Sequence, residues 1–126
     1  MQFTNLLLFG QEEAALAMVG VILLFELALI VAVLAGLWAT FAKAGKPGWA
    51  AIVPIYNIIV LLEIAKRPLW WIVLFIIPFV NFIAAIIVSL DVAKNFGKSG
   101  AFGVGLALLP FIFYPILGFG SDRYQG

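Results

Sequence analysis

Two copies of one pattern follow each other in the middle of the chain, at residues 46–66 and 67–94. Each copy opens with a basic residue, a proline and, two positions later, a tryptophan. Each then carries Pro-x-x-Asn inside an apolar run and closes with an acidic residue, one apolar residue and Ala-Lys. An apolar run of about 20 residues between charged ends is long enough to cross a bilayer. The pattern therefore predicts one membrane segment per copy.

The composition supports a membrane protein. Of the 126 residues, 66% are hydrophobic and only 10% are charged, which is more apolar surface than a soluble domain of this size can bury. The chain has no cysteine and no histidine, which excludes disulfides and Cys/His metal sites, and we expect no metal and no cofactor. A net charge of +1 gives no reason to expect nucleic-acid binding. We expect a non-enzymatic protein whose main partner is the lipid bilayer.

The apolar runs predict an all-α integral membrane protein with a single transmembrane domain over residues 1–126. The four expected membrane helices cover residues 14–42, 47–65, 68–90 and 101–119. The second is short and could be either a span or a re-entrant hairpin, and we favour a span. Segments two to four are imperfect repeats, in which prolines are expected to kink the helices by removing a backbone hydrogen bond. These prolines are Pro54, Pro78 and Pro110.

The basic residues determine orientation only weakly if all four segments cross. Four of them (Lys43, Lys46, Lys94, Lys98) would then face the three others (Lys66, Arg67, Arg123) across the membrane. A re-entrant second segment would give a more asymmetric count of five against two, which is the best argument against four spans. The tryptophans are predicted to lie at the interfaces as anchors. They are Trp38, Trp49, Trp70 and Trp71.

Three polar side chains fall within the apolar segments. Glu26 lies near the centre of the first, and Asn57 and Asn81 each follow a repeat proline by three residues. If segments two and three both span, the three side chains would lie at similar depth and could form one polar cluster. A functional cluster would be a proton or cation site in a broken helix. The structural alternative, which we favour for Glu26 and more strongly for the asparagines, is hydrogen bonding between neighbouring helices.

A helix-packing face is expected on the first segment, where small residues recur every four positions. It consists of Ala28, Ala32 and Gly36, followed by Thr40. Such a face lets two backbones approach closely, either within the chain or between subunits. The charged helix ends suggest local pairs, which are Glu63 with Lys66 or Arg67, and Asp91 with Lys94.

Three runs of the chain resemble an uncharacterised family of small bacterial multi-pass membrane proteins, and the resemblance extends from Trp38 to Gly126. The runs are AGKPGWAAIVPIYN at 44–57, SLDVAKNFGK at 89–98 and LPFIFYPILGFG at 109–120. The resemblance implies a multi-pass protein of the bacterial inner membrane. Relatives of this domain occur fused to signal peptidase I, but this sequence has no peptidase region, so we expect no peptidase activity.

Three functions are compatible with these features. The first is an oligomerising or accessory subunit of a larger membrane assembly. The alternative is a small pore or carrier for protons or cations, in which Glu26→Gln would abolish flux. The second alternative is a role accessory to a membrane-bound signal peptidase.

Overall fold

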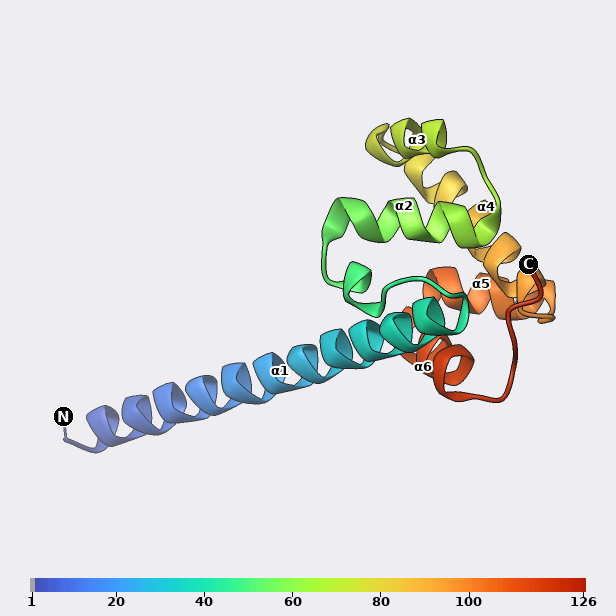
Figure 1. The fold of residues 1–126 in the computed structure, drawn as a ribbon. Helices are drawn as coiled ribbons and strands as arrows, with labels where there is room; N and C mark the ends of the chain where they lie inside the picture. Colours follow the sequence, from blue (N-terminus) through green and yellow to red (C-terminus); the bar gives the residue numbers. More distant parts are fainter. Residues whose placement is uncertain (1) are drawn as a thin grey trace. The chain divides into compact units, whose positions relative to one another are not determined.

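The computed structural model describes residues 2–126, and every regular element among them is helical. The chain forms two compact units, the first ending at Val31 and the second covering Ala32–Gly126. Figure 1 shows the elements in chain order. The expected all-α fold is confirmed.

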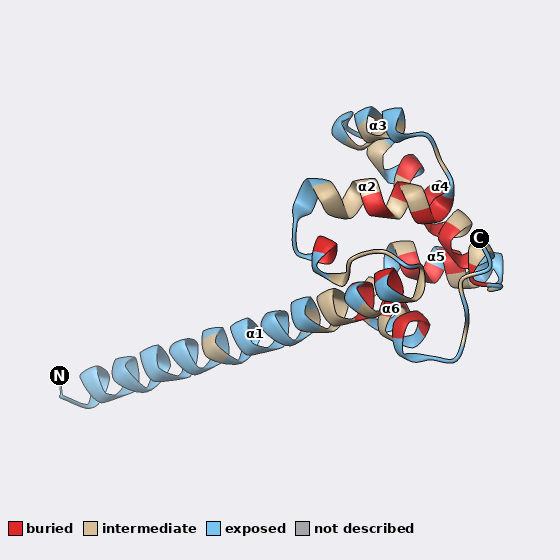
Figure 2. Ribbon diagram, in the orientation of Figure 1, coloured by how far each residue is buried: buried red, intermediate tan, exposed pale blue. Residues whose placement is uncertain are grey.

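Helix α1 (Gln2–Lys43) is the one helix in residues 2–126 that is long and apolar enough to cross a membrane. At about 1.5 Å per residue its 42 residues far exceed the roughly 20 that a crossing needs. Up to Val31 almost all of its side chains are exposed (Figure 2). No proline or charged residue interrupts the 12 residues between Glu13 and Glu26, which accounts for the continuity of the helix there.

The second unit contains three helical hairpins, each with an outgoing and a returning arm (Figure 1). Hairpin 1 pairs the 3-10 helix η1 (Gly48–Ala51) with α2 (Pro54–Ala65). Hairpin 2 pairs η2 (Leu69–Trp71) and α3 (Ile72–Ile76) with α4 (Val80–Asn95). Hairpin 3 pairs α5 (Gly100–Leu108) with α6 (Pro110–Phe119). The three hairpins cover the second, third and fourth of the segments expected from the sequence.

The repeat prolines lie where the chain reverses, so the predicted kinks within continuous helices are not found. Pro54 and Pro110 are the first residues of the returning helices, and Pro78 lies two residues before α4. Proline suits the first turn of a helix because its φ is already helical and the N–H it lacks would have no partner there. Proline, which would kink a helix at an interior position, here stands at or near the start of a new helix.

The four predicted membrane helices are therefore not confirmed. The expected segments 47–65, 68–90 and 101–119 are each divided into two arms. The longest arm, α4, has 16 residues and rises about 24 Å, which is less than the roughly 30 Å of a hydrocarbon core. The second segment follows the reversing path that the sequence left as an alternative, and the third and fourth segments follow it too.

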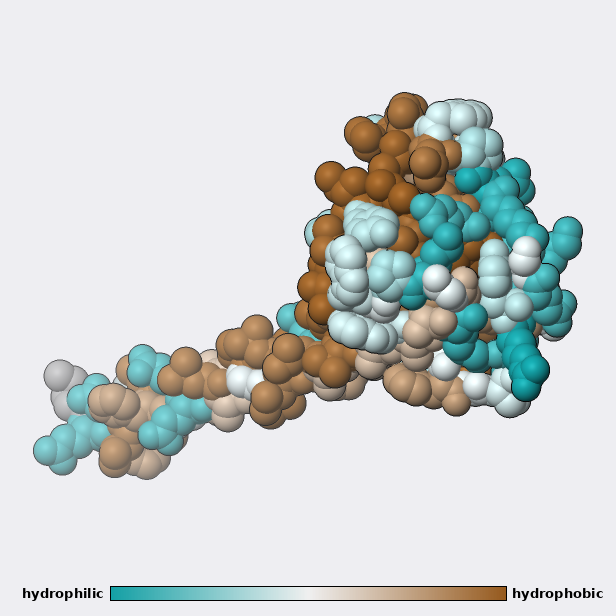
Figure 3. All heavy atoms as spheres, viewed as in Figure 1, coloured by the Kyte–Doolittle hydropathy of each residue, from teal (hydrophilic) through white to brown (hydrophobic). Residues whose placement is uncertain are grey.

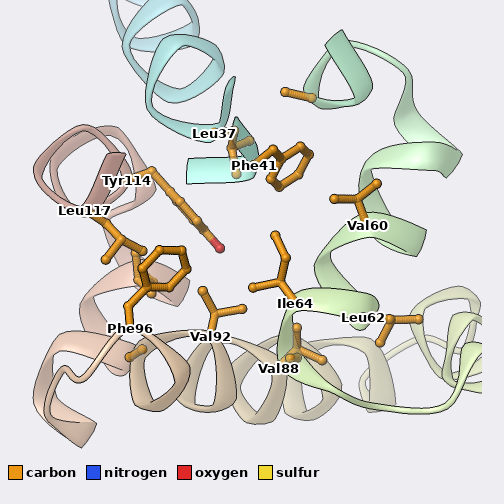
Figure 4. Packing of buried hydrophobic residues seen from close by; sticks show 14 of the residues in the cluster. Leu37, Phe41, Val60, Leu62, Ile64, Val88, Val92, Phe96, Tyr114 and Leu117 are labelled. Atoms are coloured by element: carbon orange, nitrogen blue, oxygen red, sulfur yellow. The ribbon is translucent and has the colours of Figure 1, made fainter. Parts of the chain in front are cut away.

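The hydrophobic core of the second unit draws on all three hairpins and on the last turns of α1 (Figure 4). The labelled side chains converge from α1, α2, α4 and α6. They are Leu37, Phe41, Val60, Leu62, Ile64, Val88, Val92, Phe96, Tyr114 and Leu117. No single hairpin could bury an apolar face of this size, so the core requires all of them together.

Close packing between α1 and α6 depends on two glycines. A Cβ added to Gly36 would lie 2.6 Å from the carbonyl carbon of Tyr114, and one added to Gly118 would lie 2.6 Å from the carbonyl oxygen of Gly36. The hydroxyl of Thr40 donates to that same Gly36 oxygen at 2.7 Å. The part of the predicted helix-packing face at Gly36 and Thr40 thus contacts α6 of the same chain. Ala28 is exposed within the first unit.

Candidate membrane-interaction site

In each hairpin one ion pair joins the start of the outgoing arm to the end of the returning arm. The three N–O distances are 2.6 Å for Lys46–Glu63, 2.5 Å for Arg67–Asp91 and 2.8 Å for Lys98–Asp122. In every pair the base precedes the outgoing arm and the acid lies near or just beyond the end of the returning arm. The two ends of each hairpin therefore lie together.

The ion pairs differ from the local pairs expected from the sequence. Glu63 binds Lys46 rather than Lys66 or Arg67, and Asp91 binds Arg67 rather than Lys94. Spacing along one helix suggested the local pairs, but chain reversal brings the more distant bases within reach. The signal was present in the repeat, since each copy begins with a base and ends with an acid.

The C-terminal segment ties these hairpin ends to one another. The Tyr124 hydroxyl and the Asn95 amide both donate to the Ile64 carbonyl, at 3.0 and 2.8 Å. The Gln125 N–H donates to the Asn95 carbonyl at 2.7 Å. Lys43 Nζ donates to the Leu117 carbonyl at 2.6 Å, which fastens the end of α1 to α6. The ends of α1, α2, α4 and α6 are thereby joined.

We call this region the charged end. It holds all seven lysines and arginines of the chain and three of the six acids, so its formal charge is 7 − 3 = +4. Its members are Lys43, Lys46, Glu63, Lys66, Arg67, Asp91, Lys94, Lys98, Asp122 and Arg123. Within residues 2–126, three exposed bases form no ion pair: Lys66, Lys94 and Arg123.

Hydrogen bonding and burial shift three pKa values at the charged end. The bond to Glu63 raises the pKa of Lys46, and the bond to Asp91 raises that of Arg67. Partial burial raises the pKa of the Tyr124 hydroxyl, which keeps it protonated as the donor to Ile64. The side chains of all three ion pairs are partly exposed, so water screens each pair and it contributes little to stability.

The opposite end of the hairpins is apolar and exposed. We call the three turns the tips, and define them as residues 52–55, 76–80 and 108–110. Their side chains are entirely apolar, and Ile55, Ile76 and Leu108 are each at least 66% exposed. Figure 3 shows the hydrophobic residues gathered on one side of the second unit and the hydrophilic residues on the other.

Several backbone groups at the tips have hydrogen-bond partners. The Asn57 side chain donates to the Ala51 carbonyl at 2.9 Å, and the Asn57 N–H donates to the Val53 carbonyl at 2.7 Å. In hairpin 2 the Val80 N–H donates to Pro78 at 2.8 Å, and in hairpin 3 the Leu109 N–H donates within α5 at 2.7 Å. The tip prolines have no N–H to satisfy.

The two asparagines of the predicted polar cluster lie near the tips rather than in the middle of helices. Asn57 is the fourth residue of α2, and Asn81 is the second of α4. The Asn81 Oδ1 atom is buried and has no hydrogen-bond partner among the described residues. Glu26 lies in the first unit, where it is exposed, so a cluster of all three residues stays a prediction.

Two of the four tryptophans lie beside the charged end. The Arg67 guanidinium lies 4.8 Å from the Trp71 ring, and Trp70 lies 6.2 Å from Trp71. Trp49 packs edge-on against Tyr56 at 5.2 Å, in the first turn of α2 and therefore nearer the tip. Trp38 is exposed and borders Gly48. Their predicted role as interface anchors stays a prediction.

Residues 2–126 thus define a class: an all-helical protein with one membrane-span candidate and three hairpins that are charged at one end and apolar at the other. Residues 49–126 match a family of unknown function (DUF5684), and the chain belongs to that family. The match includes nearly all of the three hairpins. Neither a curated protein nor a solved structure matches the chain.

Proposed function

We propose that this chain is a non-enzymatic integral protein of the bacterial inner membrane, which acts as a subunit of a membrane assembly. In the proposed arrangement α1 crosses the bilayer, and the three hairpins enter it from the cytoplasmic face without crossing. The observation that carries the proposal is the separation of charge in the second unit, with every base at one end and only apolar side chains at the tips.

The backbone of the tips supports insertion into lipid. An unpaired N–H or C=O in hydrocarbon costs several kcal/mol, which excludes most turns from that environment. Here the Asn57 side chain and the short turn at Val80 each satisfy a backbone group, and the tip prolines have no N–H, which lowers this cost.

The orientation follows from the charged end. Seven bases on one side form a much stronger positive-inside signal than the four against three of a four-span arrangement. Each base close to an anionic membrane surface contributes about 1 kcal/mol of attraction. Glu12 and Glu13, near the start of α1, would lie on the opposite side of the bilayer.

The hydrogen bond of Asn57 and the ion pairs of the acids favour a role in membrane assembly over transport. Asn57 is bound to the backbone of its own hairpin, so its amide serves the fold. The three acids of the second unit are each bound to a base. The exposed apolar surfaces of the hairpins can contact lipid, a second copy or another subunit. An accessory role beside a signal peptidase is a special case of this proposal, suggested by the resemblance alone.

Cysteine labelling tests the arrangement, and the chain has no native cysteine to remove. We expect Lys66→Cys and Lys94→Cys to react with a membrane-impermeant maleimide from the cytoplasmic side. Glu13→Cys, the control for α1, should react from the opposite side. Four straight spans would place residues 66 and 94 on opposite sides, and that result would overturn the hairpin arrangement.

Native mass spectrometry of the gently solubilised protein tests assembly. A homo-oligomer of fixed stoichiometry, or a constant partner, is expected. A monomer without partners in several mild detergents would contradict the proposal. Glu26→Gln, measured in parallel for proton and cation flux in proteoliposomes, examines the pore alternative, which predicts that flux is lost.

A further inference from the structure

The tip of hairpin 2 contains a strained turn. Phe79 has φ 68° and ψ −45°, and the Val80 N–H donates to the Pro78 carbonyl at 2.8 Å across it. These values describe the rare form of the γ-turn, in which the central residue has a positive φ. Glycine adopts this conformation readily, whereas a bulky aromatic residue does so only under constraint.

Nothing within the described part of the fold compensates for placing a phenylalanine there. The Phe79 side chain is 82% exposed, the highest exposure of the large hydrophobic side chains in residues 2–126. The other two tips reverse direction without a positive φ, since Phe79 and Lys66 are the non-glycine residues with positive φ in that range. A strained residue whose side chain packs on nothing points to an interaction outside the folded chain.

Resting on the proposed function, we infer that Phe79 is a membrane-insertion residue whose ring lies among lipid acyl chains at or beyond the bilayer midplane. The ring is exposed at the tip of hairpin 2, which is the end of the hairpin opposite the charged end. From Asp91 to Val80, α4 rises about 17 Å, and half of a hydrocarbon core is about 15 Å. With Asp91 and Arg67 at the interface and α4 along the bilayer normal, Phe79 would lie near the midplane.

The surroundings of Phe79 favour lipid over a protein partner. No charged residue occurs between Arg67 and Asp91, so the whole hairpin is suited to hydrocarbon. The nearby side chains Ile76 and Phe82 are exposed and apolar, and Asn81 is the one polar side chain among residues 76–82. Protein interfaces usually surround such an apolar centre with polar groups.

Depth-dependent fluorescence quenching tests the inference on the full chain. Phe79→Cys carries an environment-sensitive fluorophore in phosphatidylcholine–phosphatidylglycerol vesicles, with nitroxides at a shallow or a deep acyl carbon. We expect blue-shifted emission, stronger quenching by the deep nitroxide and no quenching by aqueous iodide. Lys94→Cys is the control and should show the reverse. Ile76→Cys reports on the same tip if the substitution at 79 prevents folding.

Three outcomes would overturn the inference. The first is stronger quenching by the shallow nitroxide, and the second is quenching by iodide. The third is protection from both lipid nitroxides and iodide, which would mean that a protein covers the ring. If Lys66 and Lys94 also label from opposite sides, the proposed arrangement itself fails. If they label from the same side, only the role of Phe79 is wrong.

Discussion

Replacing Phe79 by glycine should stabilise the fold, because it relieves backbone strain where almost no side-chain packing can be lost. A bulky residue held in a sparsely populated, positive-φ conformation costs about 1–3 kcal/mol, and part of this is offset by the roughly 0.5–1 kcal/mol of extra chain entropy that glycine loses on folding. We therefore expect Phe79→Gly to gain on the order of 1 kcal/mol.

The matched control is Phe79→Ala, which removes the ring but keeps the strain. Because the ring is exposed, this variant should stay within about 0.5 kcal/mol of the parent protein. In thermal unfolding followed by circular dichroism in a mild detergent, Phe79→Gly should melt above Phe79→Ala. A difference of 1 kcal/mol corresponds to roughly 4–8 °C for a 60–100-residue domain. If the glycine variant melts at or below the alanine variant, the turn is not strained and the reasoning about Phe79 fails.

Three further predictions follow from packing, hydrogen bonding and ionisation. Gly36→Val should destabilise the second unit by about 1–3 kcal/mol or more through overpacking against α6, whereas Gly20→Val, with open space around it, should change the melting temperature little. Asn57→Leu should cost about 1 kcal/mol in detergent unfolding through its lost bond, while Asn81→Leu should be neutral or stabilising; equal losses would contradict this. The pKa of Tyr124 is raised in the folded state, so its protonated hydroxyl contributes fully to the free energy of unfolding below pH 10, and this contribution is lost as the pH rises through the folded-state pKa. The free energy of unfolding of Tyr124→Phe should therefore decline less at alkaline pH than that of the parent protein.

The local features of the hairpins could be predicted from the sequence. Apolar runs and helix-forming residues were enough to predict an all-α fold. The exposed, apolar character of the first helix also follows from composition, because nothing along residues 14–31 offers a polar face for water except Glu26. The long helix was predicted from residue 14, whereas α1 begins at Gln2.

The path of each repeat could not be predicted, because proline at Pro54 or Pro110 is compatible with both a kink and a helix start. Local spacing likewise allowed Glu63 to pair with Lys66, and only the reversal of the chain brought Lys46 to it. The asparagines were recognised as unusual, but their place near the tips depended on the same reversal.

The sequence by itself determined the composition of each end: bases and acids at the borders of every repeat, and apolar residues with a proline at its centre. Only the tertiary structure shows that the charged ends of each repeat lie together and that its apolar centre forms the tip of a hairpin. Three segments that the sequence suggested as spans are therefore three hairpins. The physical reason is that helix propensity and hydrophobicity act over a few residues. The choice between crossing and turning back depends on contacts between residues about 17 to 24 positions apart, such as Lys46 with Glu63 and Arg67 with Asp91.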